Sequence, residues 1–419
     1  MIQTFKVRNC LSIRDEQTLN FVATGDDTCE DFAVVKKNNV RLLKLGLIYG
    51  ANASGKSNII FALGWLIRFM GGIYKESQDM HDPFLLDEDS RNRPTAMDLV
   101  FYIGDIRYEY ALEIVNNIVL SEKLTRYPLG RPAVIFQRSW NDDTRSSEIT
   151  FGSTLKLTAK QKYTLTGITK PNASVIATYI LNNVDRNEVF DEVKMYLRRQ
   201  ILPMFARTSE VEVFANNLIK AFPSVKDFII KILSQADFNI SDVLIEEEKT
   251  EIPEDVWKEI QHLSDYFENA PQRIYTEDRL FFEHTALKHS ERLPFGVEST
   301  GTGRMYGLAA YLFLLLKSQS VMLSDEIESS LHFDLLRYFV ALFLMNSGES
   351  QMICSTHSLL LLDESFVRRD NIHICRKDSM GATEVVRASE FGLRKNTSIL
   401  NAYREGKLGG IPRIGGLML

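Results

Sequence analysis

The chain has 419 residues, 45% of them hydrophobic and 25% charged, and its formal net charge is −6. This composition is that of a globular protein, so it excludes fibrous and disordered classes, and the acidic balance excludes a generally basic protein that coats nucleic acid. The four cysteines are scattered and form no CxxC pair, so the sequence predicts neither a zinc site nor a disulfide framework. The start does not resemble a leader and no apolar run is long enough to span a bilayer, so we expect a soluble cytoplasmic protein.

The first part of the chain predicts strands, then a loop and a helix. Short apolar runs with turn signals lead into LLKLGLIYG, residues 42–50, which predicts a strand buried on both faces. Residues 56–70 carry apolar side chains at helical spacing. Residues 97–127 contain three strand-like runs with GD and NN between them, which predicts an antiparallel meander.

The middle of the chain has a different texture. Between about residues 154 and 274 apolar positions recur at helical spacing and prolines break the runs, whereas strands and helices alternate again from residue 305 onward. Such alternation is typical of a parallel sheet covered by helices. We therefore predict an α/β fold with a mixed or parallel sheet, an antiparallel β meander and an inserted α-helical domain. Its predicted divisions are an N-terminal lobe (1–153), a helical insertion (154–274) and a C-terminal lobe (275–419).

Residues 50–57, GANASGKS, match the complete phosphate-loop pattern G-x-x-x-x-G-K-[ST]. Glycines let the loop fold so that its N–H groups surround an anion, and the following helix adds its positive end. The alternative, a chance glycine turn, leaves the apolar strand directly upstream unexplained. Lys56 is expected to reach the β and γ phosphates and Ser57 to coordinate Mg²⁺. The predicted nucleotide-binding residues are Gly50, Asn52, Ala53, Ser54, Gly55, Lys56, Ser57 and Asn58.

Two later strands end in polar residues that suit phosphate chemistry. VMLS is followed by Asp325 and Glu326, and MICS is followed by Thr356 and His357. At the carboxyl edge of a parallel sheet Asp325 would face Mg²⁺, Glu326 would accept a proton from water, and His357 would contact the terminal phosphate. The alternatives are that the two carboxylates cap a helix starting near residue 329 and that the histidine is an ordinary loop residue.

The order of these motifs resembles the ABC-type ATPases of the SMC and RecF branch, and within it the RloA-like ATPases of bacterial defence operons. The likeness covers the beginning and the last third of the chain, and its motifs are GANASGKS, STGTGR, DEIESSLH, STHS and NAYREGKLGGIP. It implies ATP and Mg²⁺ as cofactors, with Ser57 and Asp325 as metal ligands. It also implies that Glu326 is the catalytic glutamate and His357 the switch histidine.

The resemblance further implies a signature motif at Ser299, Thr300, Gly301 and Thr302, which covers the γ phosphate held by a second subunit. One phosphate loop and one signature in each chain then require at least a homodimer. Arg304 is near enough in sequence to add positive charge. Residues 328–332 correspond to the D-loop, and residues 83–86 are a candidate glutamine loop that lacks a glutamine.

The resemblance implies a conformational switch that ATP closes and hydrolysis reopens, and that controls a separate effector such as a TOPRIM or HNH nuclease or another toxin. The chain itself shows no nuclease motif, because acidic runs such as IEEEK (245–249) read as a solvated helix or loop face. One alternative is a RecF-like or SMC-like ATPase acting on DNA, with Arg198, Arg199 and the tail 394–413 as basic segments that leave contact with DNA or RNA open. Another is a small-molecule kinase or a transporter subunit, which the signature and the insertion disfavour.

Overall fold

The computed structural model describes residues 1–73, 82–182, 184–205, 207–236, 238–251, 253–254, 257, 274–286, 289–394 and 397–411. By its internal contacts the chain forms two compact units. Unit 1 comprises residues 1–206, 314–328 and 336–419, and unit 2 comprises residues 207–313 and 329–335. No helix in the described ranges is both long and apolar enough to cross a bilayer.

Unit 1 contains a seven-stranded antiparallel sheet in the order β10-β9-β8-β7-β6-β1-β2. Residues alternate between buried and partly exposed along β7, as one face of the sheet meets the core. The GD and NN turns lie where the sequence predicted them, and Asn116 and Asn117 have the positive φ angles that a tight hairpin needs. The predicted meander is confirmed and continues for two more strands. The strands are β1 (Ile2–Arg8), β2 (Gln17–Asn20), β6 (Thr95–Ile103), β7 (Ile106–Val115), β8 (Ile118–Tyr127), β9 (Ala133–Asn141) and β10 (Ser146–Phe151).

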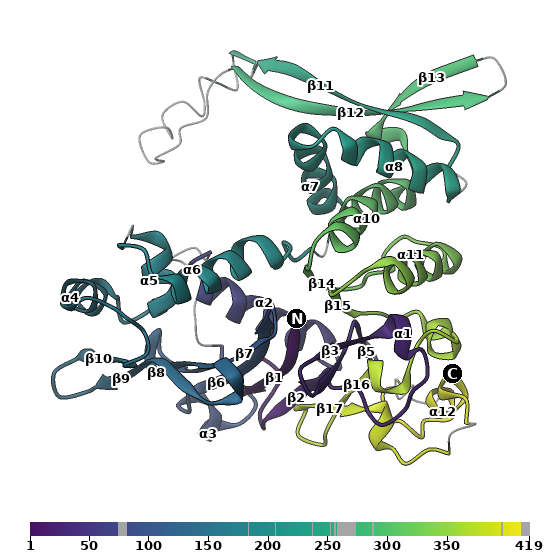
Figure 1. Ribbon diagram of the computed structural model, residues 1–419. Coiled ribbons are helices and arrows are strands. Elements are labelled where there is room, and N and C mark those ends of the chain that lie inside the picture. Colours follow the sequence, from purple (N-terminus) through teal and green to yellow (C-terminus); the bar gives the residue numbers. More distant parts are fainter. Residues whose placement is uncertain are drawn as a thin grey trace. The chain divides into compact units, whose positions relative to one another are not determined.

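The second sheet of unit 1 is mostly parallel and has the order β14-β15-β5-β16-β17. All five residues of β5 and of β15 are buried, as a strand covered on both faces requires. Only β17 runs antiparallel to its neighbour. The predicted α/β class with a mixed sheet is therefore confirmed (Figure 1). The strands are β5 (Leu45–Tyr49), β14 (Val321–Ser324), β15 (Gln351–Ser355), β16 (Ile372–Lys377) and β17 (Thr383–Arg387).

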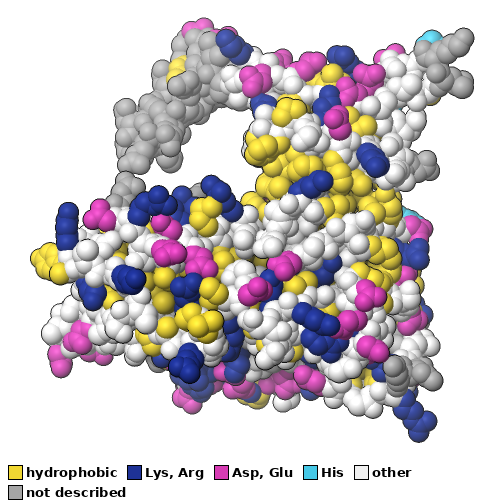
Figure 2. Space-filling view, in the orientation of Figure 1, with side chains coloured by type: hydrophobic (Ala, Val, Ile, Leu, Met, Phe, Trp, Pro, Cys, Tyr) yellow, Lys and Arg dark blue, Asp and Glu magenta, His cyan; other side chains and the backbone are white. Residues whose placement is uncertain are grey.

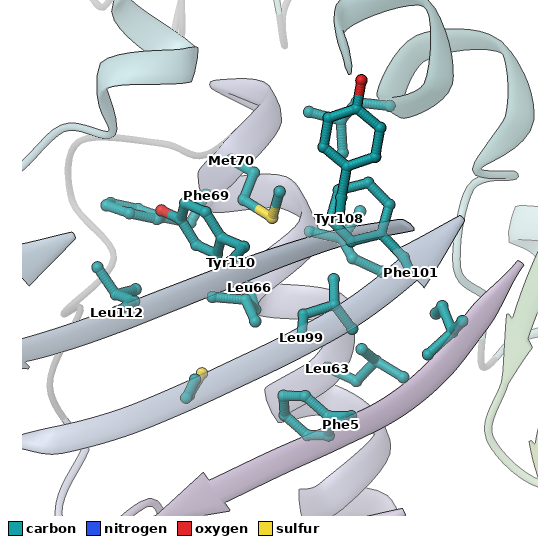
Figure 3. Packing of buried hydrophobic residues seen from close by; sticks show 14 of the residues in the cluster. Phe5, Leu63, Leu66, Phe69, Met70, Leu99, Phe101, Tyr108, Tyr110 and Leu112 are labelled. Atoms are coloured by element: carbon teal, nitrogen blue, oxygen red, sulfur yellow. The ribbon is translucent and has the colours of Figure 1, made fainter. Parts of the chain in front are cut away.

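Helix α2 (Lys56–Gly71) packs its apolar residues against the antiparallel sheet. Figure 3 shows Leu63 and Leu66 of this helix beside Phe5, Leu99 and Tyr110 of the strands. A buried aromatic or leucine side chain contributes about 1.5–3 kcal/mol relative to an exposed one, so this contact fixes the start of the helix and the loop before it. On the face of unit 1 seen in Figure 2, acidic and basic side chains are intermixed.

The remaining elements of unit 1 are short helices and one hairpin around the two sheets. The hairpin pairs β3 with β4. The bounds are β3 (Val34–Lys37), β4 (Val40–Leu43), α1 (Glu30–Ala33), α3 (Glu88–Arg91), η1 (Pro128–Gly130), α4 (Ala159–Ile168), α5 (Val175–Leu181), α6 (Glu188–Met195), the π-helix η2 (Tyr196–Gln200), η5 (Leu359–Asp363), η6 (Arg369–Asn371), η7 (Ala388–Glu390) and α12 (Ile399–Arg404).

Unit 2 combines helices with a three-stranded antiparallel sheet in the order β11-β12-β13. The acidic run IEEEK lies on β11, so its interpretation as a helix or loop face is wrong. Lys220 pairs with Glu247, and Arg279 pairs with Glu248, so cross-strand and neighbouring cations compensate the acidic side chains. Two helices continue from unit 2 into unit 1. The bounds are α7 (Thr208–Ala221), α8 (Ser224–Gln235), β11 (Ile240–Glu251), β12 (Ile274–Ala286), β13 (His289–Pro294), η4 (Phe295–Val297), α10 (Thr300–Lys317) and α11 (Phe333–Asn346).

Candidate functional site

The phosphate loop joins β5 to α2 in a conformation that demands glycine at both ends. Gly50 has a φ angle of +152° and Gly55 of +104°. A Cβ atom at Gly50 would lie 2.4 Å from the carbonyl oxygen of Cys375, and one at Gly55 would lie 2.1 Å from Oγ1 of Thr383. Ala53 also adopts a left-handed φ of +60°, which costs energy for a residue with a Cβ. The loop is therefore held in a shape that the chain does not adopt without support.

Lys56 is 5% exposed and its ammonium lies within the loop. Nζ donates to the carbonyl oxygens of Gly50, at 3.0 Å, and of Ala51, at 3.1 Å. Burial lowers the pKa of Lys56, and surrounding groups that include Cys375 and the carboxylates of residues 325, 326 and 328 partly oppose that shift. Oγ of Ser54 is also buried and has no hydrogen-bond partner among the described residues. An anion in the loop would give both polar groups a partner.

Two distant segments support the loop from behind. The Thr383 hydroxyl donates to the carbonyl oxygen of Ser54 at 2.9 Å, and it lies 2.8 Å from Oγ of Ser12. Nδ2 of Asn58 donates to the same Ser12 hydroxyl at 2.7 Å. Ser12, in a turn after β1, and Thr383, the first residue of β17, were not predicted, because single hydroxyl residues form no motif.

Asp325 and Glu326 follow β14 at the carboxyl edge of the parallel sheet, as predicted. The Asp325 side chain accepts a hydrogen bond from Oγ of Ser355, which itself accepts from the N–H of Glu326 at 2.8 Å. Glu326 has a left-handed φ of +46°. Helix α11 begins only at Phe333, so these two carboxylates do not cap it and that alternative is excluded. Ser355 is the first residue of the STHS motif, but the sequence did not predict a role for it in the site.

His357 follows β15, the strand between β14 and β5. Its Nε2 lies 3.9 Å from Oε1 of Glu326. Its backbone N–H donates to the carboxylate of Glu328, whose other oxygen is buried without a hydrogen bond among the described residues. The carboxyl ends of neighbouring parallel strands thus bring Glu326, His357 and the phosphate loop to one edge of the sheet. Glu328 acts here as a link to the histidine, a role that its D-loop position did not predict.

Two cavities flank the loop. The first has a volume of about 410 Å³ and the second of about 550 Å³, both within the usual range for ligand pockets. The first is lined by Tyr49, Gly50, Ala51, Asn52, Thr356, His357, Leu359, Tyr403, Arg404 and Ile411. The second is lined by Leu11, Ser12, Asn58, Asp82, Pro83, Phe84, Leu85, Leu86, Lys377 and Gly381. The candidate glutamine loop, residues 83–86, therefore lies on the Asn58 side of the phosphate loop.

The predicted metal ligands are oxygen donors. A hydroxyl at Ser57 and a carboxylate at Asp325 suit a hard cation that retains several waters, as Mg²⁺ does. Asp325 is 8% exposed and carries the hydrogen bond from Ser355 that orients it. No cluster of three or more His, Cys, Asp or Glu side chains that could hold a metal occurs among the described residues. The donor set thus fits Mg²⁺ bound together with phosphates rather than by the protein alone.

The predicted signature residues belong to unit 2 and open α10 there. Oγ of Ser299 accepts from the N–H of Thr302 at 3.0 Å, so this serine caps its own helix. A Cβ atom at Gly301 would lie 2.8 Å from the carbonyl oxygen of Ser330, which belongs to the predicted D-loop. Thr300 is the first residue of the helix. Arg304, which is near enough in sequence to add positive charge, is fully buried.

One of the two basic segments predicted for nucleic acid lies on a π-helix. Arg198 and Arg199 lie on the π-helix η2 and are exposed. Residues 395–396 and 412–419 of the basic tail lie outside the described residues. The segment that follows η2 runs beside β14, where the N–H of Leu202 donates to the carbonyl oxygen of Val321 at 2.9 Å.

Comparison with known proteins places the site in context. A family model described as "AAA domain, putative AbiEii toxin, Type IV TA system" matches residues 47–363, more than half of the chain and the whole stretch from β5 to η5. No curated protein matches the chain.

Solved structures of SMC heads are also similar to the chain. The SMC head domain from Thermotoga maritima shares 16% identity with a TM-score of 0.42, and the match covers 92% of this chain and 98% of that one. An SMC head bound to the C-terminal winged-helix domain of ScpA shares 13% identity with a TM-score of 0.45, covering 92% and 97%. A Pyrococcus furiosus Smc head with an extended coiled coil, bound to the C-terminal domain of ScpA, shares 12% identity with a TM-score of 0.42, covering 92% and 95%. The sheet order around the phosphate loop agrees with the expected α/β class.

Proposed function

We propose that this chain, which belongs to the AAA-domain family matched over residues 47–363, binds and hydrolyses ATP with Mg²⁺ and uses the cycle as a conformational switch. The observation that supports this most directly is the ammonium of Lys56. Among the described residues its hydrogen-bond acceptors are the carbonyl oxygens of Gly50 and Ala51, and burial lowers the pKa of Lys56. A phosphate would supply the negative charge that this position otherwise takes from more distant carboxylates.

Each of the other residues has a defined task in this proposal. The N–H groups of residues 50–58 and the start of α2 bind the phosphates. Ser57 and Asp325 would hold Mg²⁺, which neutralises charge on the phosphates when bound. Glu326 accepts the proton of the attacking water, and the imidazole of His357, 3.9 Å away, contacts the terminal phosphate.

The switch itself requires a second copy of the chain. Each chain carries one phosphate loop and one segment 299–302. In a twofold dimer the phosphate loop of each copy would hold one nucleotide, and segment 299–302 of the other copy would cover it, which gives two equivalent sites. ATP favours the closed pair, and hydrolysis removes the contact that holds it together.

The controlled activity belongs to a separate effector, a nuclease of the TOPRIM or HNH type or another toxin, in defence against phage. The description of the matched family, which names a putative toxin of a type IV toxin–antitoxin system, supports a role in such conflict systems. The resemblance to RloA-like ATPases, based on the motifs from GANASGKS to NAYREGKLGGIP, supports the same assignment.

Complementation between two inactive variants tests the composite site. Lys56→Ala removes the phosphate loop of one chain, and Ser299→Asp adds repulsion between its carboxylate and the γ phosphate of the partner while keeping a residue that caps helices. Each variant alone should lose ATP hydrolysis. Their mixture should recover up to about one quarter of wild-type activity, since half of randomly formed dimers are mixed and each contains one intact site. If the mixture recovers no activity although both variants are folded and dimeric, the signature does not act in trans.

A further inference from the structure

The C-terminal tail forms one wall of the cavity of about 410 Å³ beside the phosphate loop. Tyr403 and Arg404, the last two residues of α12, line it together with Ile411. Residues 50–52 of the phosphate loop line the same cavity. The tail comes more than 40 residues after the last motif to which a role was assigned, His357, and none of its residues has a role in the proposed mechanism.

The position of Arg404 is fixed by its neighbours. The hydroxyl of Tyr403 donates to the carbonyl oxygen of Gly410 at 2.7 Å, which closes the turn after the helix. The Tyr403 ring meets the ring of Tyr49 edge to face, with centroids 6.4 Å apart, and Tyr49 is the residue directly before the loop. At the other end of α12, Oγ of Ser398 donates to Asp363 at 2.8 Å. The tail is therefore attached to the same strand that carries the loop.

The cavity lies at the terminal-phosphate end of the loop. The carbonyl groups that accept from Lys56 Nζ belong to Gly50 and Ala51, which both line this cavity. A lysine at this position of a phosphate loop contacts the β and γ phosphates. His357, whose ring lies 3.9 Å from Glu326, lines it as well. The second cavity lies at the Asn58 end of the loop.

Arg404 brings a cation to this end. Its side chain is exposed, and within the described residues its guanidinium makes no ion pair and no hydrogen bond. By contrast, Lys407, three residues later, pairs with Glu405 at 2.5 Å. A guanidinium presents several donors in one plane and matches phosphate oxygens in pairs.

We propose that Arg404 binds the terminal phosphate of a nucleoside triphosphate, so that the C-terminal tail distinguishes the triphosphate from the diphosphate. This inference rests on the proposed ATPase function. A contact with the γ phosphate is made only before hydrolysis and phosphate release, so Arg404 would stabilise the triphosphate-bound state selectively.

The test compares Mg-ATP and Mg-ADP affinity in the full-length chain by titration calorimetry, with a non-hydrolysable β,γ-imido triphosphate as a third ligand. Arg404→Gln should weaken binding of both triphosphates by about tenfold, the value of one charge-assisted contact, and leave ADP affinity within about twofold. Arg404→Lys should restore part of the loss. Lys407→Gln is the matched control, because it removes a nearby tail cation that does not line the cavity, and all affinities should stay at the wild-type value.

Each other outcome has a definite meaning. If Arg404→Gln weakens ATP and ADP binding equally, or changes neither, the assignment of Arg404 is overturned. The proposed function still holds in that case if the wild-type chain binds ATP and Lys56→Ala does not. A wild-type chain that binds neither nucleotide overturns the proposed function itself. Circular dichroism and thermal melting of the Arg404 variants check that the fold is unchanged, as expected for an exposed side chain.

Discussion

The phosphate loop in unit 1 and the signature segment in unit 2 are both glycine-rich turns before a helix, yet the structure explains them differently. In the phosphate loop, Ala53 has a left-handed φ of +60°, Oγ of Ser54 is buried without a hydrogen bond among the described residues, and Lys56 is buried against carbonyl groups. Folding alone does not account for these features. A bound anion would account for all three.

In the signature segment, packing within unit 2 already accounts for Ser299 and for the three glycines. Ser299 caps α10, and Gly301 leaves room for the backbone of Ser330. A Cβ at Gly303 would lie 2.7 Å from the Phe295 ring, and one at Gly307 would lie 2.4 Å from Val211. An unsatisfied or strained group inside one chain therefore indicates a bound ligand. A segment that binds its ligand only together with a second chain can have the structure of an ordinary helix start.

The largest expected effect concerns Glu326, whose carboxylate lies 3.9 Å from the His357 ring. Glu326→Gln should reduce the rate of ATP hydrolysis by about 10² to 10⁴-fold, because the amide cannot accept the proton of the attacking water. ATP affinity should remain, and the ATP-bound dimer should accumulate in size-exclusion chromatography. Asp334→Asn, which alters an exposed carboxylate at the start of α11, is the control. Rapid hydrolysis by Glu326→Gln would remove this residue from the role of base.

The next effect concerns binding at the phosphate loop. Lys56→Ala should weaken Mg-ATP affinity by about 100-fold, since it deletes a charged donor to two phosphates. Equilibrium binding of a fluorescent ATP analogue measures this directly. Lys36→Ala, at an exposed lysine of β3 in the same unit, should bind normally. If Lys56→Ala binds Mg-ATP normally, the strained loop is not the phosphate site, and it no longer differs from the signature segment in indicating a ligand.

The sequence predicted unit 1 far better than unit 2. Residues 50–57 form a contiguous motif, and the strands before Asp325 and His357 are apolar enough to be recognised by themselves. Ser12, Ser355 and Thr383 were missed because their hydrogen-bond partners are far away in the chain and are brought close only by the fold. The strand at residues 245–249 was missed because its charges are neutralised across β11 and β12, a pairing that local pattern does not reveal.

A smaller effect separates the two roles open to Ser299. Asparagine caps helices about as well as serine, so Ser299→Asn should leave the melting temperature of the chain nearly unchanged. It replaces the hydroxyl with a bulkier amide, and contact with the partner's γ phosphate should be lost, lowering ATP hydrolysis by about tenfold. Ser318→Asn, at an exposed serine after α10, is the control. Full activity of Ser299→Asn would mean that capping is the whole function of this residue.

The smallest expected effect probes the packing that explains the signature glycines. Gly307→Ala places a methyl group 2.4 Å from Cβ of Val211 and 3.0 Å from its backbone, so α7 and α10 must separate and unit 2 should lose about 1–3 kcal/mol of stability. Chemical denaturation followed by circular dichroism measures the loss. Gly296→Ala has open space around the new methyl group and should be neutral or slightly stabilising. Because Lys56 lies in unit 1, both variants should keep the Mg-ATP affinity of the wild-type chain. If Gly307→Ala loses Mg-ATP affinity together with stability, the phosphate loop depends on unit 2 and is not the self-contained site that its strained residues indicate.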